Sequence, residues 1–264
     1  MSALRLCVEG VGLWSPALAD FAALRALLAG TTPPATPPRP AAATLPPNER
    51  RRAPESVLLA IEAAGQALAM SGRDAATLAC VFASSHGDQA ITDYMCATLA
   101  RAPAELSPTR FHNSVHNAAV GYWTIATGCH APSTAICAQH ASFGAGLLEA
   151  ASQVLAEQRP VQLVCSDTAG SGPLNEVTAC HQPFGCALVL APHAGPATLA
   201  RLDLTLQSGT APDPPLPEPL ASWRAGNPSA ASLPLLALLA GGGGHCQLAA
   251  AATLGLRIDM EHVT

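Results

Sequence analysis

Histidines and cysteines, which can bind metals or act as nucleophiles, lie close together at several places in the chain. His112 and His116 are four residues apart, and Cys137 lies three residues before His140. Further adjacent pairs are Cys129-His130 and Cys180-His181. Zinc needs three or four converging ligands, and structural sites favour paired short spacings. Only fragments of that pattern occur, and His112 precedes the expected start of the next helix, so we expect no metal and no other cofactor.

Two other segments contain residue types that catalytic motifs use. The run from Ser84 to Asp88 (SSHGD) places serine beside histidine. Catalytic triads are assembled from segments far apart in the sequence, so we interpret this run as a turn. The glycines from Gly241 to Gly244 lack the Lys-Ser pair or Gly-x-Gly-x-x-Gly context of a phosphate loop, and we interpret them as a flexible hairpin connection.

Composition excludes several classes of function. The chain has 264 residues, 49% of them hydrophobic and 12% charged, with a formal net charge of -5. All 13 basic residues are arginine, and there is no lysine. A broad nucleic-acid surface or a polybasic membrane anchor needs clustered positive charge. Mechanisms that use a lysine, such as a Schiff base, cannot operate in this chain.

The cysteines and the apolar segments indicate a cytoplasmic protein without a membrane span. The nine cysteines are odd in number, scattered and without a CxxC pair, which favours reduced thiols over a disulfide scaffold. The N-terminus lacks the charged and apolar regions of a signal peptide. The most apolar segment, 233–256, is interrupted by glycines, His245 and Gln247, so its unbroken part is too short to span a bilayer.

Alternating strands and helices must position the candidate residues, which indicates an α/β fold. The strands that we predict from short apolar runs are 5–12, 80–84, 132–136, 161–166, 185–191, 197–207 and 254–260. The predicted helices are 20–30, 54–70, 89–101, 115–128 and 141–158, while 107–111 is predicted to be an extended loop. We expect one domain over 1–264, with a proline-rich surface excursion at 31–47. A proline-rich connection at 212–219 leads to a C-terminal helix and strand at 231–264.

The segment 107–150 resembles the central region of β-ketoacyl synthases, which are thiolase-fold enzymes that extend acyl chains on an acyl carrier protein. The N-terminal run CVEGVGLWSP resembles their first strand, and HNAAVG, with Asn117 and Gly121, resembles their Asn-x-x-x-Gly helix start. Pro132 precedes the strand that leads to the nucleophile turn, and QPFGCALVL, from Gln182, resembles a later strand of the family. The resemblance covers residues 4–192. It implies a thiolase-like layered α-β-α fold, truncated relative to a full ketosynthase.

The departures from the family pattern concern its active site. The family acylates a cysteine at a strand-to-helix turn, and two histidines and a lysine assist. Counted from Pro132, the nucleophile position falls at His140, whose imidazole cannot replace a thiolate in a stable thioester. The C-terminal histidine motifs and the lysine are missing. Cys137 is either a displaced nucleophile or, as we expect, a buried strand residue that packs as a small hydrophobe.

The resemblance therefore implies a non-catalytic subunit of the chain-length-factor type, similar to shortened subunits of aryl polyene and xanthomonadin-type pigment systems. Such a subunit pairs with an active ketosynthase, whose acyl tunnel it helps to shape, and meets the acyl carrier protein indirectly. The pair would be a heterodimer, or a homodimer if the chain is alone. The candidate tunnel or interface residues are Phe111, His112, Val115, His116, Asn117, Tyr122, Trp123, Gln139, His140 and Phe143.

Two alternatives remain open from the residues. The chain could be an acyltransferase or thioesterase that uses Cys137 or His140. It could also be a homodimeric scaffold or binding protein with no role in chain extension. The aromatic side chains of Phe111, Tyr122 and Trp123 could equally be core residues.

Overall fold

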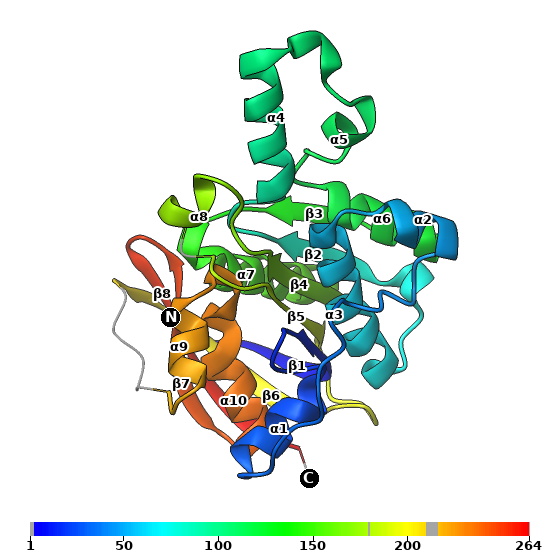
Figure 1. Ribbon diagram of the computed structural model, residues 1–264. Coiled ribbons are helices and arrows are strands. Elements are labelled where there is room, and N and C mark those ends of the chain that lie inside the picture. Colours follow the sequence, from blue (N-terminus) through cyan, green and yellow to red (C-terminus); the bar gives the residue numbers. More distant parts are fainter. Residues whose placement is uncertain (1–2, 179, 210–215, 264) are drawn as a thin grey trace.

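The computed structural model describes residues 3–178, 180–209 and 216–263 (Figure 1). In these residues the strands are β1 (Leu4–Trp14), β2 (Ala79–Ala83), β3 (Ser133–Ile136), β4 (Val161–Asp167), β5 (Phe184–Ala191), β6 (Ala200–Ser208), β7 (Gly244–Ala251) and β8 (Leu254–His262). The helices are α1 (Phe21–Leu28), α2 (Pro47–Arg52), α3 (Glu55–Ser71), α4 (Gln89–Arg101), α5 (Pro108–His112), α6 (Ala118–Thr127), α7 (Ser142–Glu157), α8 (Leu174–Val177), α9 (Leu220–Ala225) and α10 (Leu233–Gly241).

The strands form one mixed sheet in the order β3-β2-β4-β5-β1-β6-β8-β7. β2 pairs in parallel with β3 and β4, whereas the other neighbours pair antiparallel. The carboxyl ends of the parallel strands therefore meet at one end of the sheet, where ligand sites of open α/β sheets are found. The segments that follow Ala83, Ile136 and Asp167 all begin there.

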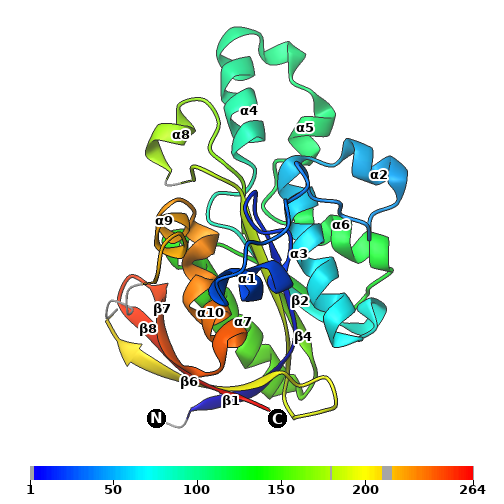
Figure 2. The same ribbon diagram turned by 60° about the horizontal axis from the view of Figure 1, so that its bottom comes forward.

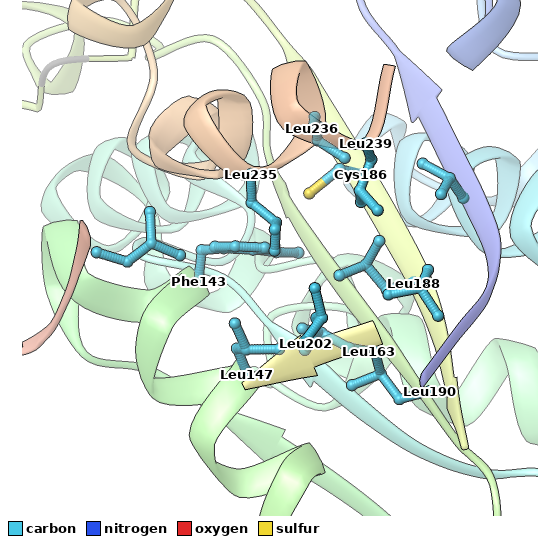
Figure 3. Close-up of a cluster of buried hydrophobic side chains, with 14 of the residues drawn as sticks. Phe143, Leu147, Leu163, Cys186, Leu188, Leu190, Leu202, Leu235, Leu236 and Leu239 are labelled. Atoms are coloured by element: carbon cyan, nitrogen blue, oxygen red, sulfur yellow. The ribbon is translucent and has the colours of Figure 1, made fainter. Parts of the chain in front are cut away.

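Helices cover both faces of the sheet, which gives the expected α-β-α layering. Figure 2 shows α3 and α6 on one side, and α7, α10 and α1 on the other. Two clusters of buried apolar side chains fill the interfaces. Figure 3 shows Phe143 and Leu147 of α7 and Leu235 of α10 beside Leu163 and Leu188 of the sheet.

The far end of the sheet bends around the helix that follows the expected nucleophile turn. In Figure 2 the strands β6, β8 and β7 curve toward α10 and α7. Gly144 of α7 faces β7 so closely that a Cβ there would overlap the carbonyl oxygen of Ala249. Glycine is thus required by close approach of the two backbones. The C-terminal strands thereby help to cover α7 within this chain.

The structure confirms the predicted α/β class and corrects several element boundaries. Residues 107–111 are not an extended loop: Pro108 opens the short helix α5, because the Ser107 side chain accepts a hydrogen bond from the Arg110 amide. The helix expected over 115–128 begins only at Ala118. The C-terminal segment holds two strands, β7 and β8, rather than one, and the glycine run links α10 to β7 instead of closing a hairpin.

The proline-rich segments are irregular, as expected where they are described. Residues 31–46 contain no strand or helix, and α2 begins only at Pro47. Of the second segment, residues 212–215 lie outside the described residues. Among the described helices, none is long and apolar enough to cross a membrane.

An arm made of α4 and α5 stands out from the body of the protein (Figure 1, Figure 2). The Arg110 guanidinium lies 4.0 Å from the centre of the Tyr94 ring, which holds the two helices of the arm together. At its base, the Ser171 hydroxyl donates to the Asp93 carboxylate over 3.2 Å. The arm is therefore a braced projection, and its residues are more exposed than those of the layers.

Candidate functional site

The turn between β3 and α7 has strained backbone at a single residue, Gln139. Its φ is +51°, in the left-handed region that non-glycine residues rarely adopt. The neighbouring Cys137 and Ala138 lead out of β3, and His140 follows on the way into α7. A sharp, strained strand-to-helix turn is also how hydrolases present a nucleophile. The tip of this turn is Gln139, one residue before His140.

Two serine hydroxyls hold the tip of the turn in place. The hydroxyls of Ser85 and Ser142 each lie 2.6 Å from the carbonyl oxygen of Gln139 and donate to it. The Ser142 oxygen also accepts from the Ala138 amide over 3.0 Å. These bonds offset the cost of the left-handed backbone, which is about 1–3 kcal/mol.

A buried carboxylate supports Ser85 in turn. Asp167, at the end of β4, is 1% exposed. Its Oδ1 accepts from the Ser84 hydroxyl at 2.8 Å and from the amides of Ser85 at 2.8 Å and His86 at 3.1 Å. Its Oδ2 accepts from the Ser229 hydroxyl at 2.6 Å. With these hydrogen bonds the carboxylate is suited to fixing the loop, and it is poorly placed to remove a proton from a ligand.

The same cluster connects the C-terminal part of the chain to the turn. Ser229 belongs to the 3₁₀ turn η4 (Pro228–Ser232). The Asn227 side-chain amide donates to the carbonyl oxygens of Asp167 at 2.9 Å and Gln182 at 2.7 Å. We call Ser84, Ser85, Asp167, Asn227 and Ser229 the Asp167 network. It joins three segments that are far apart in the sequence at the carboxyl ends of the parallel strands.

Cys137 is exposed, which corrects the expectation of a buried strand residue. β3 ends at Ile136, so Cys137 already belongs to the turn. Its thiol donates to the Ser85 carbonyl oxygen over 3.2 Å. This hydrogen bond directs the thiol toward the loop after β2.

The histidines near the turn form an edge-to-face pair and a separate contact. The ring centres of His86 and His140 are 6.4 Å apart, at an interplanar angle of 81°. His140 is exposed, whereas His86 Nε2 is buried without a hydrogen-bond partner among the described residues. His116 Nε2 lies 3.0 Å from the Ser84 carbonyl oxygen and, since a carbonyl only accepts, donates to it. Neither His86 nor His140 is hydrogen-bonded to Cys137 in the described contacts.

The other cysteines near this end of the sheet are unsuited to nucleophilic chemistry. Burial raises the pKa of the Cys186 thiol to about 12 and that of Cys180 to about 11. Burial also raises the pKa of Cys165 well above its ordinary value. No group of three or more His, Cys, Asp or Glu side chains within 3–178, 180–209 and 216–263 could hold a metal ion.

An apolar groove of about 690 Å³ lies beside the arm, between α2, α5 and α6. Five of the candidate tunnel or interface residues line it: Phe111, His112, Val115, Asn117 and Tyr122. Two of its apolar lining side chains are also exposed to solvent, Phe111 at 57% and Ile125 at 83%. The Tyr122 hydroxyl donates to Asn113 Oδ1 over 3.3 Å, which orients the ring in the groove.

The remaining candidate residues lie elsewhere. Trp123 and Phe143 are 0% and 1% exposed, and both pack in the core. His116 lies in a small hollow next to the groove, together with Ser84 and Asp88. Gln139 and His140 are at the exposed turn. The candidates thus divide between a groove, a turn and the core.

Sequence reasoning missed two parts of this site. Leu45, Pro46 and Glu49, which follow or close the proline-rich excursion, form one wall of the groove. The Asp167 network was also missed, since its members are common turn residues spread over the chain. The sequence pattern that could have indicated Asp167 is the apolar run VQLVCSD, in which an acidic residue ends a buried strand.

The three-layer α-β-α architecture and the fixed strand-to-helix turn define a thiolase-like protein, and the sequence of residues 27–251 matches the family described as β-ketoacyl synthase, N-terminal domain. The chain belongs to this family. A search of curated proteins finds no match.

Solved structures of ketosynthase complexes are similar to this chain over nearly its whole length. A chain of the ketosynthase ApeO in complex with its chain length factor ApeC, from Xenorhabdus doucetiae, has a TM-score of 0.71 and 26% identity, covering 97% of this chain and 99% of that one. A chain of AntDE:AntF, a type II PKS acyl-carrier protein in complex with its ketosynthase, has a TM-score of 0.73 and 14% identity, with 98% and 99% coverage. The ishigamide ketosynthase/chain length factor has a TM-score of 0.71 and 14% identity, with 98% and 100% coverage.

Proposed function

We propose that this chain is a non-catalytic subunit of the chain-length-factor type, which pairs with an active β-ketoacyl synthase and helps to shape its acyl tunnel. The observation that carries the proposal is Gln139 at the strained tip of the turn. In ketosynthases a cysteine is acylated at this kind of turn, and we assign its position to Gln139 rather than to His140. A carboxamide nitrogen is not a nucleophile, so no thioester can form there.

The composition and the described hydrogen bonds around the turn also favour a subunit without the reaction. No lysine is present at any position. The hydrogen bonds around the turn fix its backbone, and none of them pairs a nucleophile with a general base, the arrangement that covalent catalysis needs. This combination favours a subunit that keeps the shape of the site without its reaction.

Two features favour pairing with another thiolase-like subunit. Among the described strands, β3 is at the edge of the sheet and pairs with β2 alone, so it leaves one row of main-chain groups that could pair with a strand from a partner. Beside it, α5, α6 and the segment between them expose Phe111, Val115 and Ile125, which form an apolar surface larger than scattered single residues. In Figure 1 the edge strand β3 lies on the same part of the molecule as α5 and α6, the helices that carry these side chains.

The groove fits a role in measuring an apolar chain. Its walls are mainly apolar, and the aromatic side chains of Phe111 and Tyr122 are the largest groups that line it. The similarity of the whole chain to the ApeO and ApeC complex favours a polyene or fatty-acid-like product. The product would be made on a carrier protein that the subunit meets through its partner. The nine free cysteines favour the cytoplasm as the location.

One observation favours a second candidate, an acyltransferase or thioesterase that uses Cys137. This thiol is exposed and lies two residues from the tip of the turn. Its hydrogen bond to the Ser85 carbonyl and the absence of a bonded base among the described contacts weigh against it. A homodimeric scaffold is the third candidate, because the same apolar surface could pair with a second copy.

Copurification with a ketosynthase, followed by intact-protein mass spectrometry, tests all three. We expect a tagged chain to copurify with an active ketosynthase in equal amounts and to gain no mass when an acyl thioester is added. A stable adduct that disappears in C137A would replace the proposal with the acyltransferase. A symmetric dimer that excludes the ketosynthase would replace it with the scaffold.

A further inference from the structure

A single carboxylate lies beside the open edge of the sheet. In residues 111–156, which include β3, α6 and most of α7, Glu149 is the one acidic or basic residue apart from histidines. Glu149 belongs to α7 and is partly buried. None of the ion pairs found among the described residues involves it. Charged residues are depleted from the cores of protein interfaces, so an isolated carboxylate in this segment calls for an explanation.

Two hydrogen bonds connect this carboxylate to the edge strand. Gln153 Nε2, one turn further along α7, donates to Glu149 Oε1 over 2.8 Å and to Thr134 Oγ1 of β3 over 3.3 Å. Because both bonds come from one nitrogen atom, the carboxylate lies next to β3. Among the described strands, β3 pairs with β2 alone. A partner strand that closes this edge would therefore bring its side chains, or those of a helix beside it, close to Glu149.

The Gln153 side chain keeps an orientation that holds Glu149 in place. Its Oε1 atom is buried and has no hydrogen-bond partner among the described residues. Turning the amide over would place this oxygen against the carboxylate, and both groups only accept hydrogen bonds there. The chain thus leaves one buried acceptor unpaired and keeps the bond to Glu149. A carboxylate that is already fixed loses less side-chain entropy when it binds a partner.

A second copy of this chain offers no cation to Glu149 through the same face. A symmetric pairing of two β3 strands is isologous, so each copy presents to the other the residues that it receives. Residues 111–156 contain no arginine, and the chain has no lysine. The flanking arginines are engaged within their own chain: Arg110 lies on the Tyr94 ring, and Arg159 is already in an ion pair. A homodimer would therefore bury two unpaired carboxylates near its axis, which is costly.

We propose that Glu149 selects the partner subunit: it pairs with an arginine or lysine of the ketosynthase strand or helix that closes the β3 edge, and it disfavours a homodimer. The inference rests on the proposed function and deepens it, because it states the charge that the partner must present at this edge. Much of the pair's attraction is offset by the loss of water around both charges. Its main effect is specificity, since a partner without the cation leaves a buried carboxylate unpaired.

Competition for a limiting amount of the ketosynthase that copurifies with the unmodified chain tests this role. A variant and the unmodified chain, with different tags, are coexpressed with the ketosynthase, and their ratio in the purified complex is measured. We expect E149Q, which keeps the size of the side chain and an acceptor for Gln153, to be incorporated at least tenfold less, and E149R less still. E261Q is the matched control, because Glu261 is exposed on β8, near the opposite edge of the sheet, and it should stay within twofold.

The chain without its partner should show the opposite effect. Sedimentation equilibrium measures the self-association of each variant, and we expect E149Q to self-associate at least threefold more tightly than the unmodified chain or E261Q. The melting temperature of E149Q should equal that of the unmodified chain, since Glu149 acts on the partner and not on the fold.

A charge exchange identifies the cation of the partner. Each arginine and lysine of the ketosynthase's own edge strand and of the helices beside it is changed to glutamate, and assembly with E149R is measured. One of these changes should restore the assembly of E149R to within threefold of the unmodified pair, and the same change should weaken assembly with the unmodified chain.

Three results would overturn the selecting role of Glu149. They are equal incorporation of E149Q and E261Q, a fall in the melting temperature of E149Q that accompanies its lost incorporation, and no recovery of E149R by any charge exchange. If no ketosynthase copurifies with the unmodified chain, the proposed function fails. Tighter self-association of E149Q than of E261Q would then still show that Glu149 opposes pairing at β3, whereas equal self-association would reject this role as well.

Discussion

The Ser85 hydroxyl donates a hydrogen bond of 2.6 Å to the carbonyl oxygen of Gln139, across 54 positions of sequence. This contact joins the loop after β2 to the one strained residue of the turn after β3. Ser85 is itself held by Asp167 through its amide. The turn therefore keeps its shape through bonds to neighbouring strands, although its tip carries no nucleophile.

Replacing Ser85 by alanine should loosen this turn. We expect S85A to lose about 0.5–1.5 kcal/mol of unfolding free energy, the net value of one hydrogen bond, and to become easier to cleave near Gln139. Urea unfolding and limited proteolysis measure the two effects. S152A is the control, since the described hydrogen bond of the Ser152 hydroxyl goes to the Leu148 carbonyl oxygen on the exposed face of α7. Equal cleavage in both variants would show that Ser85 does not hold the turn.

Removing the charge of Asp167 should be more costly. In D167N the new NH₂ group faces donors of the loop or of Ser229, and a buried donor without an acceptor costs about 1–3 kcal/mol or more. We expect a clearly lower midpoint of urea unfolding. D203N, at a half-exposed surface ion pair, should change the stability by less than about 1 kcal/mol. Similar values for the two variants would argue against the network.

Gly144 and Gly121 offer a matched pair of helical glycines. In G144A the added Cβ overlaps the Ala249 carbonyl oxygen, so β7 must move away from α7 and we expect a loss of about 1–3 kcal/mol. In G121A the Cβ meets no atom within 4 Å, and alanine should stabilise α6 by about 0.5–1 kcal/mol. Thermal unfolding of both variants checks the opposite signs. A neutral G144A would mean that β7 does not pack against α7.

Changing the size of Phe111 should change the product and leave the fold intact. F111A and F111W alter the groove wall, so we expect longer and shorter chains respectively when the subunit is assayed with its ketosynthase. L99A is the control, since Leu99 is 50% exposed and does not line the groove. Mass spectrometry of the products decides the question, and an unchanged length distribution across the series would exclude Phe111 as a determinant of length.

Thiol labelling should divide the cysteines into two groups. Cys96 and Cys137 are exposed and the other seven of nine are buried, so a maleimide should modify two thiols in the native protein and nine after unfolding. C96A/C137A should show no rapid labelling. Rapid modification of a third thiol would contradict the described burial.

The buried thiols also predict a loss of stability in alkali. Burial raises the pKa of Cys80 and Cys186 to about 12, from an ordinary 9.0, so folding keeps both protonated. The stability that they contribute is fully present below pH 9.0 and declines as the pH rises toward 12. Urea titrations at about pH 8, 9 and 10 measure this loss of unfolding free energy. We expect a shallower decline with pH for C186A. Equal slopes in C186A and the unmodified protein would remove Cys186 as a cause.

The sequence predicted most strands well, because those of the central sheet are short apolar runs that end in glycine, serine or proline. Residues 161–166 and 185–191, for example, became β4 and β5 with shifts of one residue. The same method missed α5. Ser107 caps this helix and Pro108 occupies its first turn, although the segment has the composition of a loop. The method also assigned a single strand to the C-terminal segment, where β7 and β8 pair with each other, because the glycine and alanine residues around β7 have low strand propensity.

The site was harder to predict for physical reasons. The resemblance to β-ketoacyl synthases grouped Phe111, Val115 and Tyr122 as tunnel or interface candidates, and they do line one groove. The tip of the turn depends on a single dihedral angle, which counting from Pro132 cannot reveal. The partners of Asp167 come from three segments that only the sheet order brings together, and no local pattern records that order.

The open edge of β3 has a consequence for the amounts of the two subunits in a cell. An unpaired edge strand beside exposed apolar side chains is prone to aggregate with other chains. If a ketosynthase strand closes this edge, any excess of the chain over its partner would remain exposed to proteases and chaperones. Matched synthesis of the two subunits would then be as necessary for this protein as its fold.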